Sequence, residues 1–226
     1  MKNIEENGIE IDGLDEIEVE NTAVDDLESE NIHLDFVGID ESWSMNPYRG
    51  DMKKCLEEFK GGLINSKNEN EILIARSNFS DDVKTGGYKK ISEFDTGYNV
   101  FNMTALYAAI IDGTGKLLDY YKFLKDEGHH VKAVFAIFSD GEDTMNGDFG
   151  AAKKCIETLN KKEITTAFIS FGGQATQTAK DLGFRNILDV ASSASELRKA
   201  FNCLSKSVIE SSKSVLADDG DDFFQI

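Results

Sequence analysis

Short, almost wholly apolar segments alternate with longer amphipathic ones through the middle of the sequence. Val131–Phe138 is apolar except for Lys132, and its length suits a strand that is buried on both faces. We expect six strands, the third of them weaker than the others, at His33–Asp40, Glu71–Phe79, Tyr88–Phe94, Val131–Phe138, Ile164–Phe171 and Asn186–Val190. Because continuous apolar strands need cover on both sides, this pattern indicates a mostly parallel sheet.

The segments between these strands carry the spacing of a single apolar helical face. We expect helices over 51–63, 104–124, 149–159, 175–182 and 193–214, the first of them capped by Asp51. Ser193 and Glu196 form a capping box at the start of the last helix. Right-handed crossovers then give an α/β, doubly wound (Rossmann-like) fold with helices on both faces of the sheet. In such folds the functional crevice lies outside the carboxyl ends of the strands.

Acidic residues gather at the two ends of the chain. The formal net charge is −18, but residues 1–31 hold twelve acids against one lysine, and residues 217–226 hold four acids and no base. Because such blocks repel themselves, we expect a flexible acidic arm at 1–31, a single folded domain at 32–216 and an acidic-aromatic tail at 217–226. Two alternatives stay open: the arm docks as an edge strand, or the tail docks on a basic partner.

This composition excludes several classes of partner and site. The excess of acids argues against a nucleic acid or an anionic membrane surface as partner. Ala133–Phe138, the longest apolar run, is far shorter than the ~20 residues of a membrane helix, and the start of the chain does not read as a secretory signal. Cys55, Cys155 and Cys203 are far apart, which disfavours a disulfide framework or a zinc site. We therefore expect a soluble cytoplasmic protein.

Oxygen-bearing side chains follow two of the expected strands and open one of the expected helices. Asp40 ends the first strand, and Ser42 and Ser44 follow at alternate positions, which point the same way in an extended segment. Asp140 follows a second strand, and Thr104 opens the long helix, so both should face the same edge of the sheet. Two carboxylates and three hydroxyls are hard donors, which predicts a Mg²⁺ site, with Mn²⁺ and Ca²⁺ as alternatives.

These residues resemble the metal-ion-dependent adhesion site (MIDAS) of von Willebrand factor type A (vWA) domains. The match, complete in its ligand positions and in the family's order, consists of Asp40-x-Ser42-x-Ser44, Thr104 and the turn Ser139-Asp140-Gly141. Further agreement comes from Met45, Thr104–Tyr107 and Glu142-Asp143, and the resemblance covers residues 32–216. Two positions depart from it: Trp43 stands where the family usually has a small residue, and Met103 where glycine is common. Trp43 is expected either to shield the ion and contact the ligand, or to pack onto a neighbouring loop.

The resemblance implies a Mg²⁺-dependent protein-binding module and not an enzyme. In the family, an Asp or Glu of the partner completes the coordination of the ion, and the last helix, here about 193–214, can move between two states. Intracellular members often act beside ring (AAA+) ATPases or in stress-response systems such as tellurite resistance. The sequence does not specify the oligomeric state.

Two other functions remain open at this point. One is a metal-dependent hydrolase that uses the same ion to activate water, although no general base is evident near the site. The other is a structural assembly component that binds through its acidic ends. A nucleotide site is disfavoured, because Gly113-Thr114-Gly115-Lys116 lacks the full phosphate-loop pattern and falls within an expected helix.

Overall fold

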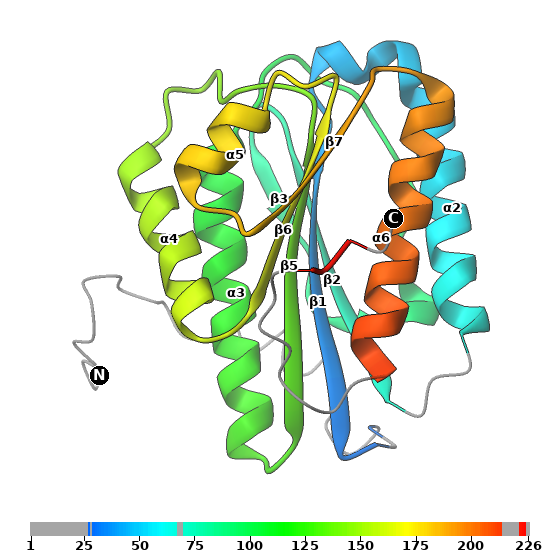
Figure 1. Ribbon diagram of the computed structural model, residues 1–226, viewed down its shortest axis with the longest axis vertical. Coiled ribbons are helices and arrows are strands. Elements are labelled where there is room, and N and C mark those ends of the chain that lie inside the picture. The colour runs from blue at the N-terminus through cyan, green and yellow to red at the C-terminus, as the bar shows by residue number, and fades with distance from the viewer. Residues whose placement is uncertain (1–26, 28, 67–69, 214–221, 225–226) are drawn as a thin grey trace.

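The computed structural model describes residues 27, 29–66, 70–213 and 222–224, and it forms a sheet between two layers of helices (Figure 1). The strands are β1 Asn31–Asp40, β2 Glu71–Phe79, β3 Val83–Thr85, β4 Lys89–Lys90, β5 His130–Ser139, β6 Thr165–Phe171 and β7 Asn186–Val190. The helices are η2 Trp43–Tyr48, α2 Arg49–Asn65, η3 Ile91–Glu93, α3 Leu106–Asp126, α4 Phe149–Lys161, α5 Thr176–Leu182 and α6 Ala194–Lys213, where η marks a 3₁₀ helix.

The sheet is mostly parallel, as the continuous apolar strands predict. Its order is β3-β2-β1-β5-β6-β7, and the short strand β4 also pairs with β2. Strands β1, β2, β5, β6 and β7 run parallel, whereas β3 and β4 run antiparallel to β2. The α/β, doubly wound class is therefore confirmed, with β1 at the centre of the sheet and hydrogen-bonded on both sides.

The two faces of the sheet carry separate apolar cores. Helices α3, α4 and α5 cover one face, and α2 and α6 lie together over the other (Figure 1). Alternate residues of β1 supply the two sides: Leu34 and Phe36 face the α3 side, and Val37 and Ile39 face the α6 side. Both cores bury large side chains almost completely, which fixes the register of β1 and the direction in which its last residue points.

Three local expectations were wrong. The segment 88–94, expected to be a strand, contains only the two-residue β4 and the turn η3, so its apolar residues pack from a loop. Asp51 does not cap α2, because that helix begins at Arg49, directly after η2. The long helix begins at Leu106, which leaves Thr104 in the loop that precedes it.

The capping of the last helix is confirmed in part. The backbone N–H of Glu196 donates to the Ser193 hydroxyl at 3.2 Å, as a capping box requires. The carboxylate of Glu196 instead accepts from Lys199 at 2.6 Å, so the reciprocal bond of the motif is replaced by an ion pair.

The amino edge of the sheet is tied to α6 by buried polar contacts. His33 Nδ1 lies 3.0 Å from Asp35 Oδ2, and His33 Nε2 lies 3.0 Å from Ser211 Oγ, in the last turn of α6. Phe223, in the acidic-aromatic tail, contacts the domain. It is buried in the core on the α2 and α6 side of the sheet, and its N–H donates to Asn186 Oδ1 at 2.9 Å. The arm at 1–26 and most of the tail lie outside the described residues. Within the described part of the chain, no helix is both long and apolar enough to cross a bilayer.

A close approach between α3 and β1 supplies the first test of this packing. A Cβ on Gly113 would lie 2.2 Å from the Phe36 ring, whereas one on Gly115, in the same helix, would meet nothing within 4 Å. We expect Gly113→Ala to lower the free energy of unfolding by about 2–3 kcal/mol through overpacking. The matched change Gly115→Ala should raise it by about 0.5–1 kcal/mol, because alanine favours the helix. Urea unfolding followed by circular dichroism measures both, and equal effects would contradict the packing described.

Candidate metal centre

The candidate site begins with a carboxylate that is completely buried at the end of the central strand. Asp40 Oδ1 accepts the backbone N–H of Ser42 at 2.8 Å, and Asp40 Oδ2 accepts the Ser139 hydroxyl at 2.6 Å. Burial, with a smaller contribution from the nearby Asp140, raises the pKa of Asp40 to about 6 even though the bonds from Ser139 and Ser42 lower it. Without a metal ion, no positive charge from the described residues balances the carboxylates of Asp40 and Asp140 at this site.

Two hydroxyls connect the first strand to the second acid. The Ser42 and Ser44 hydroxyls lie 2.9 Å apart, and the Ser44 hydroxyl donates to Asp140 Oδ1 at 2.8 Å. The expected extended segment is wrong beyond Ser42, because Ser44 already belongs to the 3₁₀ helix η2. The side chains converge all the same, since the tight turn directs Ser44 towards Asp140.

Parallel pairing of β1 and β5 explains why residues far apart in the sequence meet: Asp40 and Ser139 are 99 positions apart, and Ser44 and Asp140 are 96 positions apart. Ile39 is the register partner of Phe138, so Asp40 and Ser139 leave the sheet side by side. The pKa of Asp140 is also raised, chiefly by burial, and its bond from Ser44 lowers it.

Thr104 lies on the third loop of the site, and its side chain is buried. Its backbone is held by the loop that follows Asp140: the Thr104 N–H donates to the Thr144 hydroxyl at 2.8 Å, and the Thr144 N–H donates to the Thr104 carbonyl at 2.9 Å. This pairing fixes the threonine loop against the Asp140 loop. Among the five residues expected at the site, hydrogen bonds join Asp140 to Ser44, Ser44 to Ser42, and Asp40 to the Ser42 backbone. Thr104 is connected to them through Thr144.

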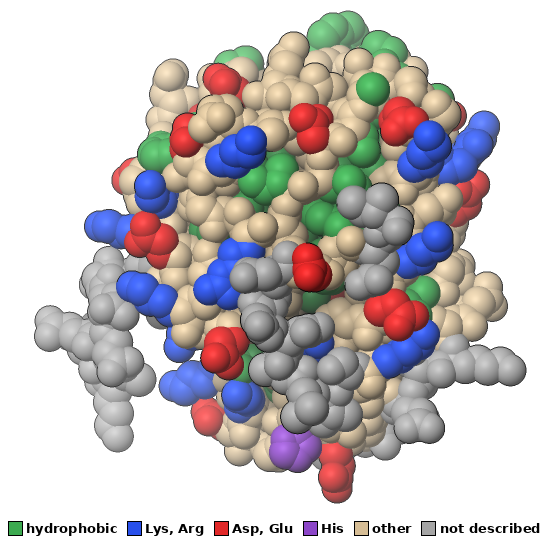
Figure 2. All heavy atoms as spheres, in the orientation of Figure 1, with side chains coloured by type: hydrophobic (Ala, Val, Ile, Leu, Met, Phe, Trp, Pro, Cys, Tyr) green, Lys and Arg blue, Asp and Glu red, His purple; other side chains and the backbone are tan. Residues whose placement is uncertain are grey.

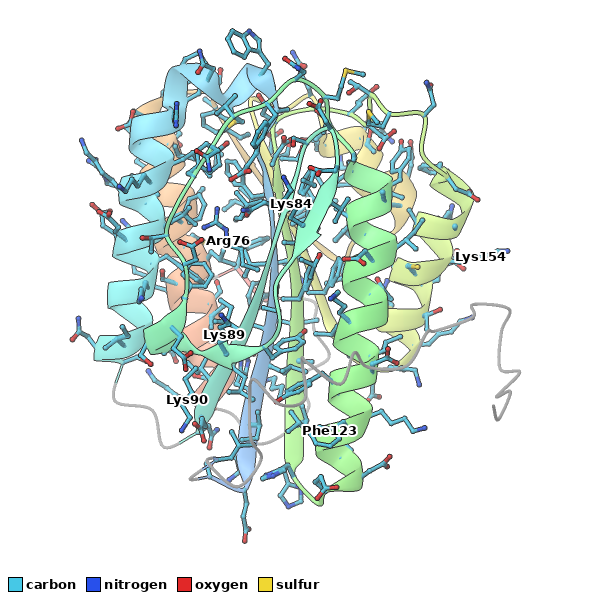
Figure 3. The ribbon with its side chains drawn as sticks, turned by 180° about the vertical axis from the view of Figure 1, so that it is seen from behind. Arg76, Lys84, Lys89, Lys90, Phe123 and Lys154 are labelled. Atoms are coloured by element: carbon cyan, nitrogen blue, oxygen red, sulfur yellow. The ribbon has the colours of Figure 1, made fainter. Side chains whose placement is uncertain are left out.

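Residues that the sequence analysis did not identify hold the end of β1 in place, at Asp40 and Glu41. The buried Arg76 guanidinium lies 3.6 Å from Glu41 Oε1 and donates to the Asp95 carbonyl at 2.7 Å. Figure 3 shows Arg76 inside the molecule, between the sheet and α2. The Tyr98 hydroxyl donates to the Asp40 carbonyl at 2.6 Å, and the N–H of Asn99 donates to Glu41 Oε1 at 3.1 Å. One sign of this buried polar network is visible in the sequence, because Arg76 is a charged residue within an otherwise largely apolar strand.

The oxygens fit a small hard cation. Adjacent oxygens of an octahedron with metal–oxygen bonds of 2.0–2.1 Å lie about 2.8–3.0 Å apart. The Ser42–Ser44 and Ser44–Asp140 oxygen separations, 2.9 and 2.8 Å, are ordinary hydrogen-bond lengths that also match that edge, so a small divalent cation could replace the hydroxyl protons with little movement of the oxygens. In the part of the chain that the structure describes, no group of three or more His, Cys, Asp or Glu could hold a metal. A metal site there would depend on hydroxyls.

Trp43 and Met103, the two departures from the family pattern, are both exposed to solvent. Trp43, between the two site serines, is 62% exposed, which is inconsistent with packing onto a neighbouring loop. The N–H of Met103 donates to Asp81 Oδ1 at 2.8 Å, so this loop is held without the usual glycine.

Sequence comparison finds no matching family model and no matching curated protein. Solved structures do match in fold. They include the pilus adhesin SpaC from Lactobacillus rhamnosus GG in its open conformation (TM-score 0.63, 12% identity, covering 81% of this chain and 30% of that one). Proximal thread matrix protein 1 (PTMP1) from the mussel byssus, with a zinc-occupied MIDAS motif, matches at TM-score 0.57 and 15% identity, covering 79% of this chain and 46% of that one.

A third structure is described as a von Willebrand factor type A protein, from Catenulispora acidiphila. It matches at TM-score 0.56 and 11% identity, covering 79% of this chain and 43% of that one. The chain thus spans less than half the length of these three structures. Taken with the sheet order and the two helical layers, the matches show that this chain has the fold of a von Willebrand factor type A domain.

Proposed function

We propose that the chain is a metal-dependent protein-binding module whose carboxyl edge holds a divalent cation, preferably Mg²⁺. The observation that carries the proposal is the continuous set of oxygens from Ser42 through Ser44 to Asp140, beside the buried carboxylate of Asp40. Asp40, Ser42, Ser44, Thr104 and Asp140 would hold the ion directly or through water. PTMP1, which shares the fold, has zinc at its MIDAS motif, and this supports a divalent ion at the matching edge.

The charge of the site supports binding of an acidic group from a partner. Ser42, Ser44 and Thr104 are neutral donors, so the two carboxylates at most balance the two positive charges of the ion. A bound Mg²⁺ prefers six oxygens and supplies an open, electrophilic position that an Asp or Glu of another protein can complete. We therefore infer that the partner is recognised by one carboxylate.

Binding is favoured over hydrolysis because the site has no evident general base. The three histidines lie at the amino edge, with His33 and His130 near the starts of β1 and β5 and His129 just before β5. The carboxylates of Asp40 and Asp140 already accept hydrogen bonds from hydroxyls, which makes them poor bases for the activation of water.

The first prediction tests the ligands. Calorimetric titration of Mg²⁺ and Mn²⁺ in the presence of acetate should show saturable binding to the wild type and none to Ser42→Ala/Ser44→Ala. Ser195→Ala, an exposed serine outside the oxygen set, is the matched control and should bind as the wild type does. Equal titrations of the wild type and the double variant would contradict the site.

The second prediction concerns stability without metal. Because the pKa of Asp40 is raised, the folded chain binds more protons than the unfolded chain between about pH 4 and 6, so this carboxylate destabilises the fold increasingly as the pH rises. Asp40→Asn can keep its oxygen on the Ser42 N–H and should stabilise the metal-free chain at pH 7.5 by roughly 3 kcal/mol. Urea unfolding in EDTA should show this gain shrinking towards pH 4, and a gain independent of pH would refute its cause.

The third prediction concerns metal affinity and pH. Protons compete with the ion for Asp40, whose pKa is about 6 in the metal-free chain. The apparent affinity should be nearly constant above pH 7 and fall by about tenfold per pH unit well below 6. Titrations in buffers of different ionisation enthalpy report the protons released. Affinity that is flat down to pH 5 would exclude this competition.

The fourth prediction separates the metal site from the acidic ends. A chain that begins at residue 27 should bind metal as the full chain does, because no described contact of the site involves the arm. The C-terminal tail is unsuitable for the same deletion, since Phe223 belongs to the core. If deletion of the arm abolishes binding of the partner while metal binding persists, the partner binds through the acidic arm and not through the metal site.

A further inference from the structure

Large apolar side chains are exposed mainly around the candidate metal site. Among the described residues, six large hydrophobic side chains are 36–62% exposed, and five of them lie on the three loops that carry the expected ligands. We call these five the apolar rim: Trp43, Phe101, Met103, Met145 and Phe149. Figure 2 shows hydrophobic side chains at the top of the molecule, the end where these loops gather in Figure 1.

Each of the three ligand-bearing loops contributes to the rim. Trp43 lies between the two site serines, and Met103 directly precedes Thr104. Met145 and Phe149 follow Asp140, in the loop and at the first residue of α4. The rim therefore borders the expected ligands on all three loops, and a group that reaches the site is placed beside these side chains.

Contacts within the domain hold parts of the rim in position. Lys84 Nζ lies 5.4 Å from the centre of the Phe101 ring. The Phe149 ring meets Tyr107 edge-on, with ring centres 5.5 Å apart. Soluble proteins rarely expose contiguous apolar patches without a binding role, and aromatic and methionine side chains are enriched in interface cores. The rim therefore has the aromatic and methionine composition of a docking surface, and contacts within the domain already hold Phe101 and Phe149 in position.

Charges next to the rim are mostly negative. The loop after Asp140 carries Glu142, Asp143 and Asp148, and the chain has no basic residue from Gly141 to Ala152. Lys84, which lies against the Phe101 ring, also lies 3.4 Å from Asp82, and Arg49 donates to Asn99 at 3.3 Å. A ligand segment with several acids would be repelled here, whereas one with basic residues outside its apolar part would be attracted.

We propose that the partner presents a segment with one Asp or Glu flanked by large apolar residues, and with Lys or Arg beyond them. This inference rests on the proposed function, since the single acid completes the metal site. The apolar flanks pack on the rim, and the outer cations face the acidic loop at 140–148. The chain's own arm also contains acids between apolar residues, as in Ile9-Glu10-Ile11, but its twelve acids make it the poorer fit to this surface.

The test starts with a displayed peptide library that has one fixed central Asp and randomised flanks. It is selected on the immobilised full-length chain in Mg²⁺ and eluted with EDTA. The proposal expects large apolar residues next to the Asp and Lys or Arg further out. Selected peptides with polar or acidic flanks would overturn it, as would tighter binding of a synthetic peptide of residues 1–31, which would make the arm the occupant.

A variant pair then ties the preference to the rim. The best selected peptide should bind Phe101→Ala/Phe149→Ala at least tenfold more weakly than the wild type, as loss of interface anchors predicts. Ile64→Ala is the matched control, because Ile64 is 49% exposed on α2 and away from the ligand loops. It should bind the peptide unchanged. Binding to the double variant within twofold of the wild type would overturn the proposal.

Metal calorimetry on the same proteins separates the two hypotheses. If the wild type and the rim variant bind metal equally and only the variant loses the peptide, both hypotheses stand. If metal binds but the flanks show no apolar preference, the rim proposal fails alone. If neither metal nor any EDTA-eluted peptide binds, the proposed function fails and the rim proposal fails with it.

Discussion

An anionic group buried without an equal positive charge is the constraint on which the candidate site depends. Asp40 has no exposure to solvent, and its hydrogen-bond donors are a backbone N–H and serine hydroxyls, all of them neutral. The buried cation nearby, Arg76, faces Glu41 instead. Because an unpaired buried charge is costly, Asp40 lowers the free energy of unfolding of the metal-free chain, and a bound divalent ion would raise that free energy again.

Pairing of the central strands β1 and β5 gives the site around Asp40 a defined geometry. The ends of β1 and β5 are adjacent because the strands are parallel and in register, and both cores fix that register. Glu41, Tyr98 and Thr144 then hold the loops through bonds to backbone groups. The ligand side chains occupy short loops on a rigid sheet, as a preorganised binding site requires.

The sequence predicted what hydrophobic periodicity and strand ends determine, and failed where tertiary contacts decide. The strand Glu71–Phe79 matches its expected bounds because it is buried along nearly all of its length, and the edge strand Asn186–Val190 matches its bounds as well. The five site residues could be chosen from the rule on carboxyl ends and from the family resemblance, and their role in metal binding remains a prediction. The segment 88–94 has the apolar residues of a strand, but Tyr88 and Phe94 pack into the two separate cores from positions outside the short strand β4. Arg76 and Phe223 act through partners far away in the sequence, which no local pattern reveals.

The central place of β1 also has a consequence for how the edge can fluctuate. Amides of β1 are bonded on both sides by β2 and β5, so they should exchange with solvent deuterium only when the whole domain unfolds. The loop that carries Thr104 is held by bonds to Asp81, Thr144 and the Glu41 carbonyl, all of which lie outside the strands, so their opening does not disturb the sheet. Fluctuations at the carboxyl edge would then be unequal: the loop that carries Thr104 would move, and the carboxylate of Asp40 would stay in place.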